Sequence, residues 1–454
     1  MPVRFVIIGG GPAGMQAATN AARLGAEVTL VERDVMGGSA NLWDCIPSKA
    51  MIATGGVIGV TRRGHALGLT CTSATLDLPA LAERIGLISG YLERSVTELL
   101  TSQEVRVIRG RATLKGPHDV VVETSDGRIL ELDADAILLS TGSRPRVPDW
   151  AEVDGRRVMI TRQAYPPPEV PEHLVVIGSG VTGVEFVHMF RAFGSKVSLI
   201  VSRQQVLPGK DPEVAAALEA DFLSTGVILY KGARATGVKL KDDGLVVQCN
   251  DGRVVEGSHA LLAIGPVPNS EGLGLEAAGV DVDEGGYVPV NQHCQSNVGH
   301  IYAAGDLSGK LPLASVASTQ GRKVAEHVMG LHTREHRHLD YDKAASAIFT
   351  EPEIADVGLA EADAFALGRK IRVTKVPFAA NARALIDGDA RGFVKIVSDP
   401  ATGVVLGGSI VGERAAELIS VIALAVTAHL RVADIGESLL VHPALAEALA
   451  EAAE

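Results

Sequence analysis

The chain has 454 residues, of which 46% are hydrophobic and 21% are charged, and this composition excludes a disordered or fibrous protein. At about 150 residues per domain, the length predicts roughly three domains. The formal net charge of −12 and an aromatic share of only 4% argue against a nucleic-acid-binding surface. Apolar runs such as Val421 to Val426 are far too short to span a membrane, and the N-terminus has no signal-peptide pattern.

Four cysteines, Cys45, Cys71, Cys249 and Cys294, are scattered along the chain without a close pair. This spacing predicts neither a disulfide framework nor a zinc site, and we expect no bound metal. A reducing compartment is the simplest setting for such thiols, so we expect a cytoplasmic protein.

A strand, a glycine-rich turn and a helix open the chain. Residues 3–8 predict a buried strand, and the G-x-G-x-x-G turn that follows allows a pyrophosphate to approach the N-terminus of the next helix. A second strand, residues 27–31, ends in Glu32, where a carboxylate is expected to bind a ribose 2′-hydroxyl. The candidate cofactor-binding residues of the turn are Gly9, Gly11, Pro12, Ala13 and Gly14.

The same pattern returns in the middle of the chain. A strand at residues 174–177, a second G-x-G-x-x-G turn, a helix and a strand at residues 196–201 repeat the first unit. Two copies predict two dinucleotide-binding domains. The first copy is longer, because it carries an insert after Glu32 that holds Cys45 and Lys49. The candidate residues of the second turn are Gly178, Gly180, Val181, Thr182 and Gly183.

The pattern changes beyond residue 340. Segments 347–350, 393–397 and 404–411 predict strands separated by helices, so this last part is expected to be α+β. The helix predicted over residues 417–430 is apolar nearly all round, which indicates burial within the domain or between subunits.

From end to end, the chain resembles the flavoprotein disulfide reductases, a family that includes dihydrolipoamide dehydrogenase, glutathione reductase and mercuric reductase. The matching motifs are the first turn with Glu32, Gly37-Gly38, Cys45-Ile46-Pro47-Ser48-Lys49, Ser140-Thr141-Gly142, the second turn with Glu185, Ile301-Tyr302-Ala303-Ala304-Gly305-Asp306, and His442-Pro443 with Glu447.

The resemblance implies an α/β fold with two Rossmann-like domains and an α+β dimerisation domain. Residues 1–150, completed by about 270–340, would bind FAD. Residues 151–269 would bind NAD(P), and residues 341–454 would build a homodimer.

The resemblance also implies roles for single residues. Asp306 would hydrogen-bond the flavin ribityl chain, and Lys49 would pair with Glu185 beside the flavin N5. His442 and Glu447 would form the acid–base dyad that serves the redox dithiol of the neighbouring subunit. Further expected cofactor-binding residues are Gly38, Ser39, Lys49, Thr141, Gly142, Gly265 and Ala314.

The nucleotide preference of the second site is open. Its second strand ends in Ser202 and Arg203 rather than in an acid, which favours the 2′-phosphate of NADPH. Arg203 could equally be a solvated surface charge. Gly183 favours NADH, because many NADP-using relatives carry alanine at this position. We therefore predict NADPH, with NADH as the alternative.

One departure from the family pattern decides the predicted reaction. Ala40 stands where the family has the first cysteine of its redox pair, although Cys45 is retained. An alanine methyl group cannot exchange with a disulfide, so electrons would have to pass directly from the reduced flavin to an acceptor. The chain looks most like the branch that reduces quinones, which predicts a ping-pong NAD(P)H:quinone oxidoreductase.

Other functions stay open. A dithiol reductase could take its missing thiol from elsewhere, such as Cys71. Transhydrogenation between NADH and NADP⁺ needs the same reduced flavin but no quinone. The protein could also be a flavin-bearing binding or scaffold protein that has lost catalysis. Pro47 is expected to be the first residue of a helix, so Cys45 would lie near the helix N-terminus, where it could be inert or could tune the flavin as a thiolate. His442-Pro443 is likewise expected to start a helix. His442 and Glu447 could protonate a reduced quinone or form a structural hydrogen bond at a dimer interface.

Overall fold

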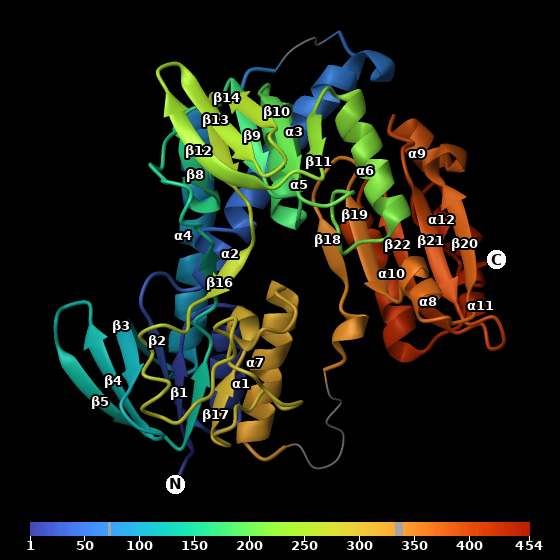
Figure 1. Cartoon of the computed structure of the whole chain (residues 1–454). Helices are drawn as coiled ribbons and strands as arrows, with labels where there is room; N and C mark the ends of the chain where they lie inside the picture. Colours follow the sequence, from blue (N-terminus) through green and yellow to red (C-terminus); the bar gives the residue numbers. More distant parts are fainter. Residues whose placement is uncertain (71–73, 332–338) are drawn as a thin grey trace. The chain divides into compact units, whose positions relative to one another are not determined.

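The computed structural model describes residues 1–70, 74–331 and 339–454, and these residues form two compact units (Figure 1). The first unit comprises residues 1–48, 79–146 and 266–341. The second comprises residues 49–78, 147–265 and 342–454. Cys71, the alternative source of a second thiol, lies outside the described residues.

The first unit is built on a seven-stranded sheet in the order β17–β6–β1–β2–β3–β4–β5. The strands from β17 to β3 are parallel, and β4 and β5 extend them as antiparallel partners. Since β2 and β6 flank β1, the sheet has its topological switch point at the carboxyl end of β1, where ligands bind in such folds. A two-stranded ribbon pairs β7 with β16. The strands are β1 (Arg4–Ile8), β2 (Glu27–Glu32), β3 (Arg106–Leu114), β4 (Asp119–Thr124), β5 (Ile129–Asp133), β6 (Ala136–Leu139), β7 (Ser143–Pro145), β16 (Pro266–Pro268) and β17 (Ile301–Ala303).

Two helices of the first unit, α1 (Pro12–Arg23) and α7 (Ala314–Val328), lie against each other (Figure 1). A Cβ at Gly321 would lie 2.0 Å from the Ala13 carbonyl oxygen, so only glycine permits this approach. The predicted insert after Glu32 is helical, and a single 3₁₀ turn precedes α7. These elements are α2 (Gly38–Leu42), α3 (Cys45–Arg63), η1 (Gly64–Leu67), α4 (Leu78–Ser102) and η3 (Gly305–Ser308). Of these, η1 and the part of α3 from Lys49 onward belong to the second unit.

The second unit repeats the parallel plan in a sheet of order β11–β10–β9–β15–β8. Here β9 lies between β10 and β15, so the switch point recurs. A three-stranded antiparallel sheet, β12–β13–β14, is attached. The elements are β8 (Val158–Ile160), η2 (Thr161–Gln163), β9 (His173–Ile177), α5 (Val181–Phe193), β10 (Lys196–Val201), α6 (Pro212–Ser224), β11 (Ile228–Lys231), β12 (Ala235–Lys241), β13 (Gly244–Cys249), β14 (Val254–Gly257) and β15 (His259–Leu262).

The C-terminal part of the second unit is an antiparallel sheet of order β18–β19–β22–β21–β20 with helices, as the sequence predicts. Together with the two parallel sheets, it confirms the predicted fold class. Its elements are η4 (Tyr341–Lys343, which begins at the last residue of the first unit), β18 (Ser346–Ile348), β19 (Ile354–Gly358), α8 (Glu361–Ala366), β20 (Arg372–Pro377), η5 (Phe378–Ala380), α9 (Ala382–Ile386), β21 (Phe393–Ser398), β22 (Val405–Val411), α10 (Ala415–Ala428), α11 (Val432–Gly436) and α12 (Glu447–Ala453).

The apolar helix α10 was predicted to be buried within the domain or between subunits. Within this single chain it is buried on one face only, through residues such as Ile419 and Ile422. On the other face, Val421 is 37% exposed and Leu424 is 64% exposed. One helix can press only one face against its own domain, so a second chain remains the predicted partner of the outer face.

Within residues 1–70, 74–331 and 339–454, every helix is too short or too polar to cross a membrane.

The buried His188 predicts how stability depends on pH. This side chain on α5 is 9% exposed, and burial lowers its pKa from 6.5 to about 4. The folded chain therefore keeps the imidazole neutral, whereas the unfolded chain takes up a proton below pH 6.5. We expect this group to cost about 2 kcal/mol of unfolding free energy between pH 7 and pH 5.

Urea unfolding of the parent and of His188→Gln at both pH values tests this expectation. The variant should lose less stability on acidification, by about that amount. His65→Gln, at an exposed position, should behave like the parent. An equal pH dependence in His188→Gln and the parent would show that His188 does not titrate as its burial predicts.

Candidate functional site

The first glycine turn brings the N-terminus of α1 close against the end of β1. Gly9 has φ +109°, and a Cβ at Gly14 would lie 1.9 Å from the Gly9 carbonyl oxygen. Gly11, the N-cap of α1, provides no side-chain cap, and a Cβ there would meet no atom within 4 Å. The first-turn N–H groups of α1, at Ala13 and Gly14, therefore have no side-chain cap, which suits the binding of a pyrophosphate.

Glu32 lies at the end of β2, 8% exposed, with its carboxylate held by two backbone N–H groups. Oε2 accepts from Gly10 at 2.6 Å, and Oε1 accepts from Asp34 at 2.7 Å. Each oxygen keeps a lone pair that can accept from a ribose hydroxyl, which is the role that the sequence predicts for Glu32. Gly38, which opens α2 ahead of Ser39, approaches the same turn, because a Cβ at Gly38 would lie 2.9 Å from the Gly11 Cα.

A second group of polar residues lies around Asp306 in η3. Its Oδ2 accepts a hydrogen bond from the Ser143 hydroxyl at 2.5 Å. Thr141 and Gly142 lie between β6 and β7, and Asn269 donates hydrogen bonds to the carbonyl oxygens of both residues. Ser143 and Asn269 were missed by sequence reasoning, although Ser143 directly follows a motif that was recognised. The remaining candidate, Ala314, is exposed and begins α7, whose N-cap has no side-chain hydrogen bond.

The second turn has nearly the same geometry as the first. A Cβ at Gly183 would lie 1.9 Å from the Gly178 carbonyl oxygen, and Gly180 again leaves the N-terminus of α5 without a side-chain cap. Val181 and Thr182 are exposed at the start of the helix, and Gly265 has φ +92°. These residues also fit a dinucleotide.

Val201, the last residue of β10, takes the position that the acid Glu32 has at the end of β2, and two exposed residues, Ser202 and Arg203, follow it directly. The Arg203 carbonyl accepts from the Gly232 N–H at 3.0 Å, which fixes the backbone beneath the side chain. An exposed guanidinium is free to reach an anionic group, but its placement alone does not distinguish NADPH from NADH.

Within the second unit, Lys49 on α3 and Glu185 on α5 form the ion pair that the resemblance implies. The Lys49 Nζ lies 3.0 and 2.9 Å from the two Glu185 carboxylate oxygens, and the Glu185 side chain is 4% exposed. Phe349, which follows β18, supports both partners. Its N–H donates to Glu185 Oε1 at 3.0 Å, and its ring centroid lies 4.6 Å from the Lys49 Nζ. Sequence reasoning missed Phe349, because no local pattern marks it.

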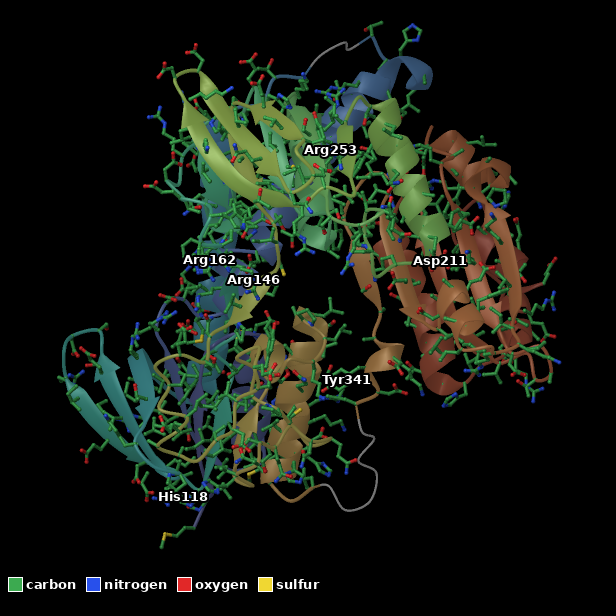
Figure 2. The ribbon with its side chains drawn as sticks, in the orientation of Figure 1. His118, Arg146, Arg162, Asp211, Arg253 and Tyr341 are labelled. Atoms are coloured by element: carbon green, nitrogen blue, oxygen red, sulfur yellow. The ribbon has the colours of Figure 1, made fainter. Side chains whose placement is uncertain are left out.

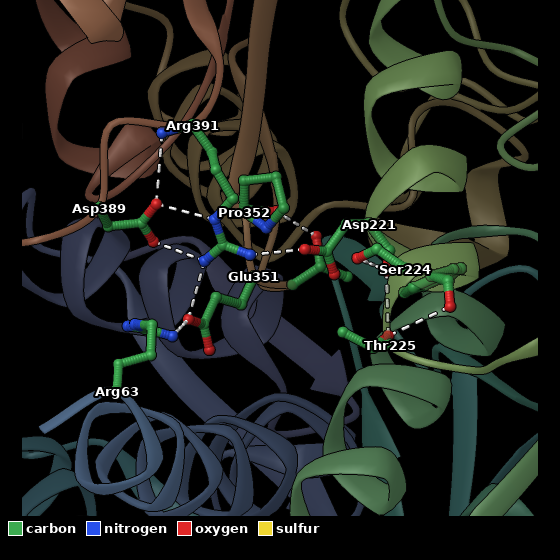
Figure 3. A network of polar contacts seen from close by, with 10 residues as sticks. Arg63, Asp221, Ser224, Thr225, Glu351, Pro352, Asp389 and Arg391 are labelled. Carbon is green, nitrogen blue, oxygen red and sulfur yellow. Dashed lines mark hydrogen bonds and ion pairs between the residues drawn. The ribbon is translucent and has the colours of Figure 1, made fainter. Parts of the chain in front are cut away.

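The chain beyond Phe349 is held by a charged network (Figure 3). Glu351 pairs with Arg63, at the other end of α3 from Lys49, and with Arg391 at 2.9 Å. Arg391 also bonds Asp389 and Asp221, each at 2.5 Å. The hydrogen bond to Asp389 raises the pKa of Arg391, so this guanidinium stays charged. The network thus fixes the segment that carries Phe349 against α3.

Ala40 and Cys45 occupy neighbouring helices of the first unit. Ala40 lies in α2 and presents a methyl group, whereas Cys45 is half-buried as the first residue of α3. The sequence predicted Pro47 as the first helical residue, and this is wrong by two positions. Proline is tolerated there because the N–H groups of the first turn have no partner within the helix.

His442 and Glu447 lie together near the C-terminus. His442 Nδ1 is 2.7 Å from Glu447 Oε1, while the Ala444 N–H donates to Oε2 at 2.9 Å. The Ala444 N–H and His442 lower the pKa of Glu447. The His442 side chain is 73% exposed. The prediction that Pro443 starts a helix is wrong, because α12 begins at Glu447.

Comparison with known families decides the relationship. Residues 3–321 match the pyridine nucleotide-disulphide oxidoreductase model, and residues 344–453 match the dimerisation domain of the same family. The chain belongs to this family. The members of this oxidoreductase family use FAD and NAD(P)H, so the protein is a flavoprotein oxidoreductase, and the match to the dimerisation domain supports the expected homodimer.

Individual relatives span the full chain. A Mycobacterium tuberculosis protein named NAD(P)H dehydrogenase (quinone) is 40% identical over 100% of this chain and 94% of its own. A dihydrolipoyl dehydrogenase of Zymomonas mobilis is 34% identical, covering 98% and 96%. The crystal structure of LpdA from Mycobacterium tuberculosis superimposes with a TM-score of 0.94 at 40% identity, covering 99% of both chains. The flavoprotein disulfide reductase RclA from Escherichia coli gives 0.88 at 25% identity, covering 99% of both chains.

The two short contacts of Glu32 generate a prediction for FAD affinity. In Glu32→Gln the side-chain oxygen can accept from only one of the two backbone N–H groups. The other N–H then faces the side-chain NH2 group, which cannot accept a hydrogen bond. We expect FAD to bind about tenfold to a hundredfold more weakly, since hydrogen bonds to a charged group contribute about 1.5–3 kcal/mol. Fluorescence of FAD released on dilution measures this change. Release as slow as in the parent would show that the carboxylate does not contribute to FAD binding.

Proposed function

We propose that the protein is an FAD-dependent NAD(P)H:quinone oxidoreductase that works without a disulfide relay. The observation that carries this proposal is Ala40, which stands where the family has its first redox cysteine. The relative that is 40% identical and named NAD(P)H dehydrogenase (quinone) supports it.

Electron balance explains why the substitution matters. A disulfide relay needs two thiols, one that attacks the substrate disulfide and one that closes the new bond. With a methyl group at position 40, the relay cannot form in the family's manner. FAD held by the first unit would supply the two-electron carrier between the nucleotide and the acceptor. The overall reaction is NAD(P)H plus H⁺ plus quinone giving NAD(P)⁺ plus hydroquinone, with the nucleotide leaving before the quinone is reduced.

We propose the following roles for the chain's own residues. Residues 1–150, completed by about 270–340, hold FAD through the first turn, Glu32 and Asp306. Residues 151–269 hold the nucleotide, and residues 341–454 form the dimer. Lys49, oriented by Glu185, provides a fixed positive charge at the redox centre. The hydrogen bond between Glu447 and His442 orients the imidazole, which suits it to deliver a proton to a reduced quinone.

Anaerobic half-reactions test the proposed function. The enzyme is reduced with NADPH or NADH in a stopped-flow instrument, and is then mixed with a quinone or with oxidised lipoamide. The quinone should reoxidise the flavin rapidly, whereas lipoamide should leave it reduced. Rapid reoxidation by lipoamide would instead support a dihydrolipoyl dehydrogenase-like activity, and reoxidation by NADP⁺ alone would support transhydrogenation.

Cys45 should be dispensable for quinone reduction, because it lacks a second thiol at position 40. We expect Cys45→Ser to keep kcat with a quinone within about threefold of the parent. Steady-state assays at saturating NADPH measure this value. A loss of more than about 100-fold, which corresponds to about 2.7 kcal/mol, would show that the thiol takes part in turnover.

Arg203 should set the nucleotide preference. We expect Arg203→Ala to raise KM for NADPH about tenfold or more and to leave KM for NADH unchanged, since the two nucleotides differ only in the 2′-phosphate. Arg156→Ala, at an exposed position of the same unit, is the control and should alter neither constant. Equal changes in KM for both nucleotides would show that Arg203 is a solvated surface charge and does not bind the 2′-phosphate.

A further inference from the structure

We propose that Gln320 is a positioning residue that holds the turn bearing Asp306 in the shape that binds the flavin. This inference rests on the assignment of FAD to the first unit, which the proposed function shares. Gln320 has no place in any of the matching motifs, and it lies 14 positions beyond Asp306 in the sequence, on α7.

The Gln320 side chain is 1% exposed and uses both ends of its amide. Its Oε1 accepts from the Gly305 N–H at 2.7 Å. Its Nε2 donates to the Tyr341 hydroxyl at 2.9 Å and lies 3.4 Å from the Ser308 hydroxyl. A buried amide with donors and acceptors matched in this way strongly favours one rotamer.

The partners fix which way the amide points. The Gly305 N–H can only donate, so the oxygen must face it and the nitrogen must face Tyr341, a residue that is labelled in Figure 2. Tyr341 is the last residue of the first unit and also bonds the buried thiol of Cys294. Burial raises the pKa of Tyr341, so its hydroxyl stays neutral and can accept the amide proton.

The turn that Gln320 holds is the one that presents Asp306. Gly305 has φ +68°, and the Ser308 hydroxyl bonds back to the Gly305 carbonyl at 2.7 Å. Gln320 and Ser308 therefore fix the N–H and the carbonyl of Gly305, directly before Asp306. Ser143 fixes the Asp306 carboxylate itself. Without Gln320, the Gly305 N–H loses its partner and the turn loses one of these restraints.

The neighbouring glycine lets α7 pack directly against α1. Gly321 lies so close to Ala13 that its missing Cβ would be 2.0 Å from the Ala13 carbonyl oxygen. The same stretch of α7 thus contacts the first turn of α1 and the turn of Asp306. Gln320 is held at the point where these two cofactor-binding elements meet.

Four holoenzyme variants test the proposal. Gln320→Met keeps the length of the side chain but removes both hydrogen bonds. Gln320→Glu keeps an oxygen that accepts from the Gly305 N–H, and its second oxygen can accept a hydrogen bond from the Tyr341 hydroxyl. Tyr341→Phe removes only the anchor of the amide. Thr319→Ala is the matched control on the same helix, because the Thr319 hydroxyl bonds back to the Ser315 carbonyl.

Two readouts are taken on each sample: the rate of FAD release, from flavin fluorescence, and the melting of secondary structure in the presence of excess FAD, from circular dichroism. We expect Gln320→Met to release FAD about tenfold faster, Tyr341→Phe to fall between it and the parent, and Gln320→Glu and Thr319→Ala to match the parent. The melting temperature should stay within about 3 °C in all four variants.

Unchanged release in Gln320→Met and Tyr341→Phe would overturn the proposal. Release of FAD from Gln320→Glu as fast as from Gln320→Met would also overturn it. So would faster release from Gln320→Met that comes with a fall in melting temperature well beyond about 3 °C, because either result indicates a merely structural role. Neither readout involves an electron acceptor, so the outcome is independent of whether a quinone is the substrate.

Discussion

The carbonyl oxygen at the end of one strand approaches the following helix so closely that a side chain cannot fit between them, and this occurs twice. A Cβ would lie 1.9 Å from that oxygen at Gly14 and again at Gly183. Each helix therefore starts directly at the carboxyl end of its strand, with the N–H groups of its first turn directed to the switch point of the sheet. The two nucleotide sites, in separate units, follow from this one steric constraint.

The two copies diverge in what surrounds that shared turn. The first copy has Glu32, held by two backbone N–H groups, and an insert of helices that carries Ala40, Cys45 and Lys49. The second ends the equivalent strand in Val201, followed by the exposed Ser202 and Arg203. One template thus carries the predicted redox residues, and the other has only residues that are expected to bind a nucleotide. The Lys49–Glu185 pair gains its support from Phe349, in the part of the chain that matches the dimerisation domain.

Sequence patterns predicted the elements that repeat. Apart from the Lys49–Glu185 pair, which the family resemblance implies, they missed contacts between distant segments. The strand–glycine–helix units were found because their spacing is local, and the α+β character of the C-terminal part followed from strand-like runs. Ser143, Phe349 and Gln320 were missed, since each acts through a partner far away in the sequence, and backbone donors such as the Phe349 N–H leave no mark in residue type. The start of α3 was misplaced because proline fits any position of a first helical turn. The exposed face of α10 looked buried because apolar content does not reveal which chain covers it.

The stoichiometry of anaerobic reduction measures the loss of the thiol relay most directly. A chain that passes electrons without a disulfide stores them only in its flavin. One equivalent of NAD(P)H per bound FAD should then reduce the enzyme completely, and the number of thiols that can be alkylated should not change. A requirement for two equivalents, with two new thiols appearing on reduction, would reveal a working disulfide and contradict direct transfer from the flavin.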